Sequence, residues 1–252
     1  MIETEKREDG VVVLTLAHGK ANVMDLELCT VLAERFEALA DAPPPALVVT
    51  GTGRTFSAGV DLGRLLDGGA DYVVEFRPSL DRMLQSLLDV PCPVVAAVNG
   101  HAIAGGCLLA CAADRRLMAN GSGRVGLPEL RVGVPFPPLA LELARSVIRQ
   151  VWLQRLISGG ETLDPETAET AGLVDERVDV EHLVDRAAAL AASLTSIGAP
   201  AYALTKAMLQ QPLRDRTERS RETFAERVDA LWGDPATFEA VRAFVTRTMG
   251  KG

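Results

Sequence analysis

The chain has 252 residues, a formal net charge of −8, and a composition in which 48% of residues are hydrophobic and 4% aromatic. That length suits one large domain or two small ones, and the composition is that of an ordinary globular protein with an aliphatic core. The acidic balance and the lack of a strong basic run argue against nucleic acid as a partner, and no apolar run approaches the ~18 residues that span a bilayer.

The N-terminus and the cysteines narrow the class of protein further. The first ten residues, MIETEKREDG, are charged and lack the apolar core of a signal peptide, so we expect a cytoplasmic enzyme with no membrane partner. Cys29, Cys92, Cys107 and Cys111 form no C-x-x-C pair, and the three histidines are scattered. Cys107 and Cys111 have helical spacing in an apolar run, where free cysteine behaves as a small hydrophobe, so no metal site is expected.

The first half of the chain alternates strand and helix signals. Residues 10–17, GVVVLTLA, are short and β-branched, which predicts a strand. Residues 24–42 have apolar positions at the spacing of an amphipathic helix, with Asp25 as its N-cap. Prolines precede the predicted strands in 43–53 and 91–100. This alternation indicates crossover units and a mostly parallel sheet.

After about residue 137 the strand signals fade and helical patterns dominate. The segments predicted as helices are 139–157, 180–197, 199–213 and 237–249. The sequence therefore predicts an α/β core over residues 1–195 followed by a helical C-terminal region over residues 196–252.

Common nucleotide and hydrolase motifs are missing. The loop GTGRTFSAG follows a predicted strand, but Phe56 stands where G-x-G-x-x-G needs its third glycine. Neither a Gly-Lys-Ser/Thr phosphate loop nor a G-x-S-x-G nucleophile elbow occurs. What remains are two strand-to-helix junctions rich in small residues, FSAGVDL (56–62) and HAIAGGCLL (101–109).

The glycine pair Gly105–Gly106 opens an apolar stretch in which glycine disfavours helix by roughly 1 kcal/mol relative to alanine. One interpretation is that these glycines expose backbone N–H groups at a helix start, and that one donor from each junction binds a single oxygen as an oxyanion hole. The alternative is that they only allow a helix to pack tightly against a sheet.

Four ordered motifs resemble the crotonase family, the enoyl-CoA hydratase/isomerase superfamily. The motifs are FSAGVDL, VVAAVNGHAIAGGCLLACAADRRLMA, GLPELRVGV and LISGGETLDPETAETAGLVDERV. Together they cover nearly the whole chain. The resemblance implies a ClpP/crotonase-like α/β spiral of ββα units with a helical C-terminal region, an acyl-CoA thioester as substrate, a homo-trimer or hexamer, and no cofactor beyond the CoA of the substrate.

The resemblance also implies roles for individual residues. The N–H groups of Val60 and Gly105 would form the oxyanion hole for the thioester carbonyl. The positions implied to line the substrate and CoA groove are Ala21, Val23, Ala58, Asp61, Leu62, Gly106, Leu108 and Pro128.

One carboxylate position decides the expected chemistry. Hydratases of the family carry a glutamate three residues after the oxyanion glycine and a second one in the later Pro-Glu motif; here the first is Leu108 and the second is Glu129. Hydration uses two carboxylates around a water, whereas moving a double bond needs one proton shuttle. Outside the resemblance, Glu129 would be a solvated carboxylate beside Arg131.

We therefore expect an isomerase that shifts a 3-enoyl-CoA double bond to the 2-position, with Glu129 in an apolar pocket as the proton shuttle. An enoyl-CoA hydratase with an atypical acid/base arrangement is the first alternative, and a catalytically silent acyl-CoA-binding protein is the second. A serine peptidase of similar fold lacks a convincing Ser–His–Asp order. We further expect Asp114 to pair with Arg115 or Arg116, and Lys206 to be solvated.

Overall fold

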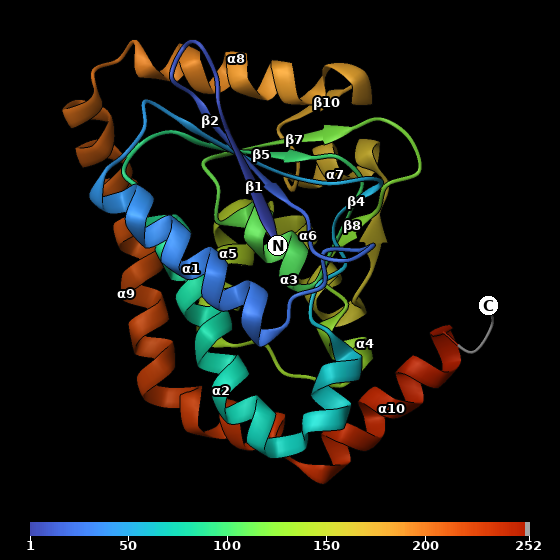
Figure 1. The fold of residues 1–252 in the computed structure, drawn as a ribbon. Coiled ribbons are helices and arrows are strands. Elements are labelled where there is room, and N and C mark those ends of the chain that lie inside the picture. Colours follow the sequence, from blue (N-terminus) through green and yellow to red (C-terminus); the bar gives the residue numbers. More distant parts are fainter. Residues whose placement is uncertain (250–252) are drawn as a thin grey trace.

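The computed structural model describes residues 1–249 and contains two sheets. The larger sheet has the strand order β1-β2-β3-β5-β7-β10, in which β1 pairs antiparallel with β2 and every other neighbouring pair is parallel (Figure 1). The predicted parallel sheet is thus confirmed. Its strands are β1 Ile2–Lys6, β2 Val12–Leu16, β3 Leu47–Gly51, β5 Val94–Val98, β7 Arg115–Ala119 and β10 Glu176–Val178.

The smaller sheet has the order β4-β6-β8-β9 and sets up a repeat along the chain. A strand of the large sheet, a short strand of the small sheet and a helix follow one another three times: β3-β4-α2, β5-β6-α3 and β7-β8-α4. The helix of each unit therefore begins just after the small sheet. The strands of the small sheet are β4 Thr55–Ser57, β6 His101–Ile103, β8 Val125–Gly126 and β9 Thr162–Leu163.

Helices cover both faces of the large sheet because its central strands β2, β3, β5 and β7 are largely buried on both sides. On β5, Val94, Ala96 and Val98 belong to the main core, whereas Val95 and Ala97 face a second cluster that α8 closes. Figure 1 shows α8 on one side of the sheet, and α1, α2, α3 and α5 on the other. These helices are α1 Leu26–Asp41, α2 Leu62–Asp89, α3 Gly105–Cys111, α5 Pro138–Val147 and α8 Leu183–Thr195.

The remaining helices complete the site and the C-terminal region. Helix α9 is one 34-residue helix that packs on α5, and α10 crosses α2 and α4. The boundary drawn at residues 195/196 falls between α8 and α9, and the division into two folding units stays a prediction. These helices are α4 Glu129–Val132, α6 Gln150–Gly159, α7 Pro165–Ala171, α9 Ala199–Trp232 and α10 Pro235–Met249.

Several local expectations are confirmed and others are corrected. Asp25 caps α1 by accepting a hydrogen bond from Leu28 N at 2.8 Å. The helix expected over 139–157 is two helices, because the chain is extended at Ile148 and Arg149. Helix α2 is not among the predicted helices. Its helical periodicity is interrupted by Pro78 and by Gly69, which has φ +60°.

Asp114 and Lys206 differ from their expected roles. Lys206 is buried, and its Nζ lies 2.7 Å from Asp114 Oδ2 and donates to Cys92 O at 3.1 Å. Arg116 pairs with Asp175 instead of Asp114. Lys206 therefore is not a solvated surface lysine but joins α9 to the α/β core.

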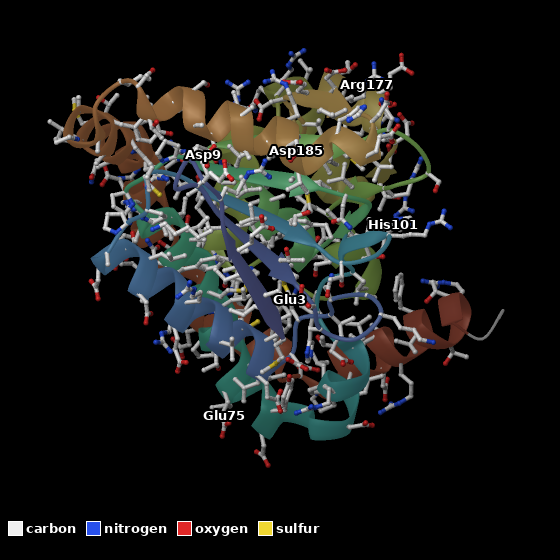
Figure 2. The ribbon with its side chains drawn as sticks, turned by 45° about the horizontal axis from the view of Figure 1, so that its top comes forward. Glu3, Asp9, Glu75, His101, Arg177 and Asp185 are labelled. Carbon is white, nitrogen blue, oxygen red and sulfur yellow. The ribbon has the colours of Figure 1, made fainter. Side chains whose placement is uncertain are left out.

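Charged side chains spread over the outside of the molecule, as the labelled Glu75, Arg177 and Asp185 illustrate (Figure 2). Among residues 1–249, no single helix has the length and hydropathy to span a membrane. One pair of helical segments, Val180–Thr195 and Ala199–Trp232, bent by 103°, meets that criterion on length and composition.

Candidate active site

A cavity of about 100 Å³ lies where α2, α3 and α4 meet the C-terminal helices. Its wall is apolar except for two carboxylates. The N-terminal and central part of the chain contributes Ala58, Val60, Leu62, Leu80, Asp81, Leu84, Ile103, Ala104, Gly105 and Leu108, and the later part contributes Pro128, Glu129, Val132, Val134, Pro137, Ala140, Trp232 and Phe244.

The two backbone amides expected to form an oxyanion hole lie together on this wall. A Cβ built on Gly105 would be 3.9 Å from Val60 Cγ2, so the two residues are neighbours. The Met24 N–H donates to Gly59 O, and the Met24 carbonyl accepts from Asp61 N. Val60 lies between these two bonded residues, and its own N–H has no acceptor among the described residues. Gly105 is the first residue of α3, so its N–H has no acceptor within the helix. Two residues with unpaired backbone donors therefore line one cavity.

The backbone before Gly105 is strained in a way that the sequence does not show. Ala104 has φ +50° and ψ −120°, a region that residues with a Cβ seldom adopt. Its N–H donates to Gly126 O at 2.9 Å and its carbonyl accepts from Leu108 N at 2.9 Å, which hold it in place. This conformation sets the direction of the peptide that carries the Gly105 N–H.

A buried polar network holds the other junction. The Asn22 side chain donates to the carbonyls of Thr55 and Phe56 at 3.0 and 3.2 Å, and Ser57 Oγ donates to Asn22 O at 2.7 Å. Ser57 Oγ also accepts from Gly59 N at 3.1 Å. Sequence reasoning missed Asn22 and Ser57. The available signal was a short polar side chain beside small residues, in GKANVM (19–24) and in FSAGVDL (56–62).

The two glycines of the pair have different surroundings, and each fits one of the two interpretations, tight helix packing or exposure of a backbone amide. A Cβ on Gly106 would lie 2.4 Å from Ser57 O and 2.8 Å from Ser57 Cβ, so Gly106 permits α3 to pack directly on β4. A Cβ on Gly105 would meet only the flexible end of Met24, at 2.8 Å from its Sδ. Tight packing thus explains Gly106, whereas Gly105 carries the amide that faces the cavity.

Glu129 is the first residue of α4, directly after Pro128, and its side chain is buried. Neither carboxyl oxygen has a hydrogen-bond partner within residues 1–249. Burial in this apolar wall raises the pKa of Glu129 to about 8. The carboxyl group is therefore buried and is not the solvated neighbour of Arg131, and a pKa near neutral pH is one that suits a general acid or base.

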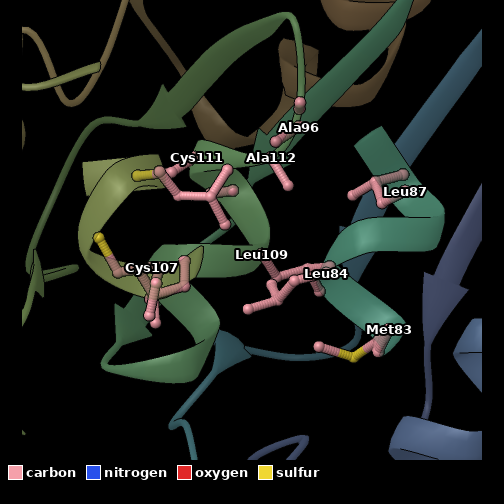
Figure 3. Close-up of a cluster of buried hydrophobic side chains, with 14 of the residues drawn as sticks. Met83, Leu84, Leu87, Ala96, Cys107, Leu109, Cys111 and Ala112 are labelled. Atoms are coloured by element: carbon pink, nitrogen blue, oxygen red, sulfur yellow. The ribbon is translucent and has the colours of Figure 1, made fainter. Parts of the chain in front are cut away.

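Leu108 stands on α3 with 2% of its surface exposed and lines the cavity as an apolar residue. Leu84 of α2 also lines the cavity, and Figure 3 shows its side chain beside Leu109 of α3. The wall is therefore apolar at Leu108, the position where the resemblance places the first glutamate of hydratases.

Asp81 is a second cavity carboxylate that sequence reasoning overlooked. It lies one helical turn after Arg77 on α2, and its Oδ1 is 2.9 Å from Arg77 Nη1. Burial raises the pKa of Asp81, an effect that the Arg77 charge opposes. The i,i+4 spacing of Arg and Asp was visible in the sequence, but the cavity beside it was not.

The other predicted positions lie outside the cavity wall. Ala21 O accepts a hydrogen bond from Ala58 N at 2.9 Å, and the Asp61 carboxylate caps α2 by accepting from Arg64 N at 3.0 Å. Val23 is half-buried beside Met24, and Gly106 is held by its packing on β4. Contact of these residues with CoA stays a prediction. Within residues 1–249, no group of three or more His, Cys, Asp or Glu side chains is placed to hold a metal ion.

Comparison with known proteins agrees with this architecture. The family model for enoyl-CoA hydratase/isomerase matches residues 6–247. The chain is 32% identical over 213 residues to a putative enoyl-CoA hydratase of Thermus thermophilus, covering 83% of each protein. It is 32% identical over 209 residues to the 2,3-dehydroadipyl-CoA hydratase of Escherichia coli, covering 81% of this chain and 80% of that protein.

Solved structures show the same fold. A probable enoyl-CoA hydratase of Mycobacterium tuberculosis superposes with a TM-score of 0.83 at 28% identity, covering 91% of this chain and 96% of that one. The human mitochondrial delta3-delta2-enoyl-CoA isomerase superposes with a TM-score of 0.92 over 99% of this chain and 98% of that one, but its 23% identity speaks for the fold alone.

A spiral of ββα units with a helical C-terminal region and an apolar cavity beside two helix starts defines an acyl-CoA enzyme of the α/β class. The chain belongs to the crotonase family, the enoyl-CoA hydratase/isomerase superfamily. The fold prediction and the family resemblance are thereby confirmed.

Proposed function

We propose that the protein is an enoyl-CoA isomerase that converts a 3-enoyl-CoA thioester to the 2-enoyl isomer. The observation that carries this proposal is the state of Glu129: a carboxyl group in an apolar wall, without a hydrogen-bond partner among residues 1–249, beside the amides of Val60 and Gly105. These are the parts that a one-base proton shuttle requires.

The proposed reaction moves a single proton. The thioester carbonyl oxygen accepts hydrogen bonds from the Val60 and Gly105 amides, which stabilise negative charge on that oxygen. The Glu129 carboxylate removes the C2 proton and the electrons delocalise over the dienolate. The same carboxyl group then returns the proton to C4, and the double bond lies between C2 and C3. Leu108 supports this route because it replaces a carboxylate that would hold water.

Hydration of a 2-enoyl-CoA is the second candidate, and two observations favour it. Asp81 gives the cavity a second carboxylate, and the relatives from Thermus thermophilus and Escherichia coli are both named hydratases. Burial raises the pKa of Asp81, but the charge of Arg77 opposes that rise, so Asp81 is a weaker candidate base than Glu129, which has no cation beside it.

The test compares both reactions in the same preparation. Isomerisation is followed as 2-enoyl thioester formed from 3-enoyl-CoA, and hydration as uptake of label at C3 of 2-enoyl-CoA in water enriched in the heavy oxygen isotope. We expect isomerisation to dominate. Glu129→Gln should lower it at least about a hundredfold, whereas the exposed Glu75→Gln should leave it unchanged. Dominant label uptake would replace the isomerase proposal with the hydratase.

A silent acyl-CoA-binding protein would show tight binding without either reaction in both the parent and the Glu129→Gln variant. The homo-trimer or hexamer and the cytoplasmic location remain part of this proposal. Exposed Leu204, Met208 and Leu209 on α9 support self-association, which sedimentation of the full chain would measure.

A further inference from the structure

The wall of the active-site cavity contains one charged group that the proposed proton shuttle does not use. Of the residues that line the cavity, Asp81 and Glu129 alone carry ionisable side chains. The indole N–H of Trp232 already donates to Pro135 O at 2.9 Å. A ligand in this cavity therefore meets, apart from Glu129 and the oxyanion amides, a single polar side chain with bonding capacity left.

Asp81 is placed beside a cation but has hydrogen-bonding capacity left. Its Oδ1 lies 2.9 Å from Arg77 Nη1, yet this buried oxygen has no hydrogen-bond partner within residues 1–249. Arg77 donates instead from Nε to Asp229 Oδ1 at 2.9 Å. Oδ2 lies 3.9 Å from Arg221 Nη2, beyond hydrogen-bond distance. The Asp81 carboxylate therefore keeps free lone pairs.

The two buried charges at this site cancel. Arg77 and Asp81 form a pair of opposite charges. The side chains of Arg221, Asp229 and Glu218 around them are more exposed to solvent. A compensated cluster leaves Asp81 as a hydrogen-bond acceptor without a surplus charge, which suits a neutral donor better than a cation. The side chains of Arg77 and Asp81 are 9% and 13% exposed, so water reaches them poorly.

A plain alkyl chain fits this wall badly. It would cover a carboxylate oxygen without replacing the hydrogen bonds that water gives it, which is unfavourable by roughly 1–3 kcal/mol. A site built around such an acceptor discriminates strongly against ligands that lack the donor. The pair also gives little stability in itself, because buried ion pairs are often no better than apolar side chains of equal volume.

The cavity is small. One water needs roughly 10–15 Å³ of such space, so a cavity of about 100 Å³ has room for only several waters. Trp232 and Phe244 contribute to its wall from the C-terminal helices. The part of the acyl group inside the cavity is therefore short.

We propose that the acyl group is short and carries a hydroxyl at the end remote from the thioester, which donates a hydrogen bond to the Asp81 carboxylate. This inference deepens the proposed function, because it rests on the acyl chain occupying the same cavity. It holds for isomerisation and for hydration alike, since both place the thioester at the oxyanion amides.

The experiment measures binding of unreactive matched thioesters by titration calorimetry on the full chain. Each pair exchanges a terminal methyl for a hydroxyl at equal length: pentanoyl, hexanoyl and heptanoyl-CoA against their ω-hydroxy counterparts that are one carbon shorter. We expect at least one hydroxyl ligand to bind about tenfold tighter than its methyl partner. Equal or tighter binding of every methyl ligand overturns the proposal.

Variants assign the preference to Asp81. Asp81→Asn keeps a carbonyl acceptor and should keep the preference, whereas Asp81→Leu should abolish or reverse it. Should Asp81→Leu fail to fold, the double variant Arg77→Met/Asp81→Leu removes the pair together and makes the same comparison. A preference that persists in the Leu variants overturns the assignment to Asp81.

Two further measurements distinguish the proposed role of Asp81 from other roles it could have. An ω-amino ligand that binds tighter than the ω-hydroxy ligand would show recognition of a cation and overturn the hydroxyl. Loss of label uptake from heavy-oxygen water in Asp81→Asn would make Asp81 a hydration acid and overturn its role as a distal acceptor. Because the titrated ligands do not react, absence of isomerase activity with an intact hydroxyl preference would refute the proposed function alone.

Discussion

The carboxyl group of Glu129 is held where water and hydrogen-bond donors are scarce. Its two oxygens are buried without partners in the part of the chain that the structure describes, and its pKa rises to about 8. A buried carboxyl group without hydrogen bonds lowers the stability of the protein. Such a loss of stability is common where a site is adapted to activity. Both consequences can be measured.

The first prediction concerns stability. In the unfolded chain the Glu129 carboxyl ionises near its ordinary pKa of 4.5, whereas in the folded protein it keeps its proton up to about pH 8. Folding stability therefore falls as the pH rises between these values. Gln at this position does not titrate, so the melting temperature of Glu129→Gln relative to the parent should increase from pH 5 to pH 8, by the equivalent of a few kcal/mol.

The control for this measurement is Glu75→Gln on the exposed face of α2, for which the difference from the parent should not follow this pH course. A Glu129→Gln difference that is constant over the same range would contradict the burial of the carboxyl group.

The second prediction concerns rate. The proton shuttle needs the carboxylate form to begin, so kcat/KM for 3-enoyl-CoA should rise with pH and level off above about pH 8. A profile measured from pH 6 to pH 9 checks this. A flat profile over that range would mean that Glu129 is not the group that removes the proton.

At the scale of elements, the junction of β6 and α3 sets the position of the Gly105 amide that is proposed for the oxyanion hole. Ala104 at positive φ turns the chain, Gly105 presents its N–H, and Gly106 lets the helix lie against β4. The position of one amide thus depends on the contact between a helix and a strand.

The third prediction tests that dependence. Gly106→Ala places a methyl group 2.4 Å from the Ser57 carbonyl oxygen, so α3 must shift. We expect a loss of about 1–3 kcal/mol in stability and a fall in kcat greater than the change in KM. Gly105→Ala is the matched control for the melting temperature alone, because its methyl group comes closer than 3 Å only to the Met24 side chain. Similar melting temperatures for Gly106→Ala and the parent would refute the close contact.

At the scale of the whole molecule, the C-terminal helices contribute to the wall of the cavity proposed as the active site. Trp232 ends α9, Phe244 lies on α10, and both line the cavity. The buried pair of Lys206 and Asp114 joins α9 to the core. Asp114 Oδ2 also accepts from Val94 N at 2.8 Å and from the Tyr202 hydroxyl at 3.2 Å.

The fourth prediction concerns this attachment. Lys206→Met leaves Asp114 poorly compensated, which should lower stability by on the order of 3–5 kcal/mol. For a chain of this length that corresponds to roughly 10 °C in melting temperature. Lys6→Met, at an exposed position on β1, should change it little. Equal melting temperatures for the two variants in thermal denaturation would show that the pair does not anchor α9.

The sequence by itself predicted the strands β3 and β5 that precede the two junctions, the N-cap at Asp25 and a mostly parallel sheet. These follow from local periodicity and turn chemistry, which neighbouring residues determine together. The order of four motifs identified the family, and that resemblance singled out Val60, Gly105, Leu108 and Glu129, which line one cavity.

Only the tertiary structure decided what depends on contacts between distant segments. The burial that shifts Glu129, the twisted backbone of Ala104, and the meeting of Asp81 with Trp232 and Phe244 at one cavity arise from elements far apart in the chain. A residue's type and spacing specify which bonds it can make, but its dielectric surroundings and its partners exist only after the helices have packed.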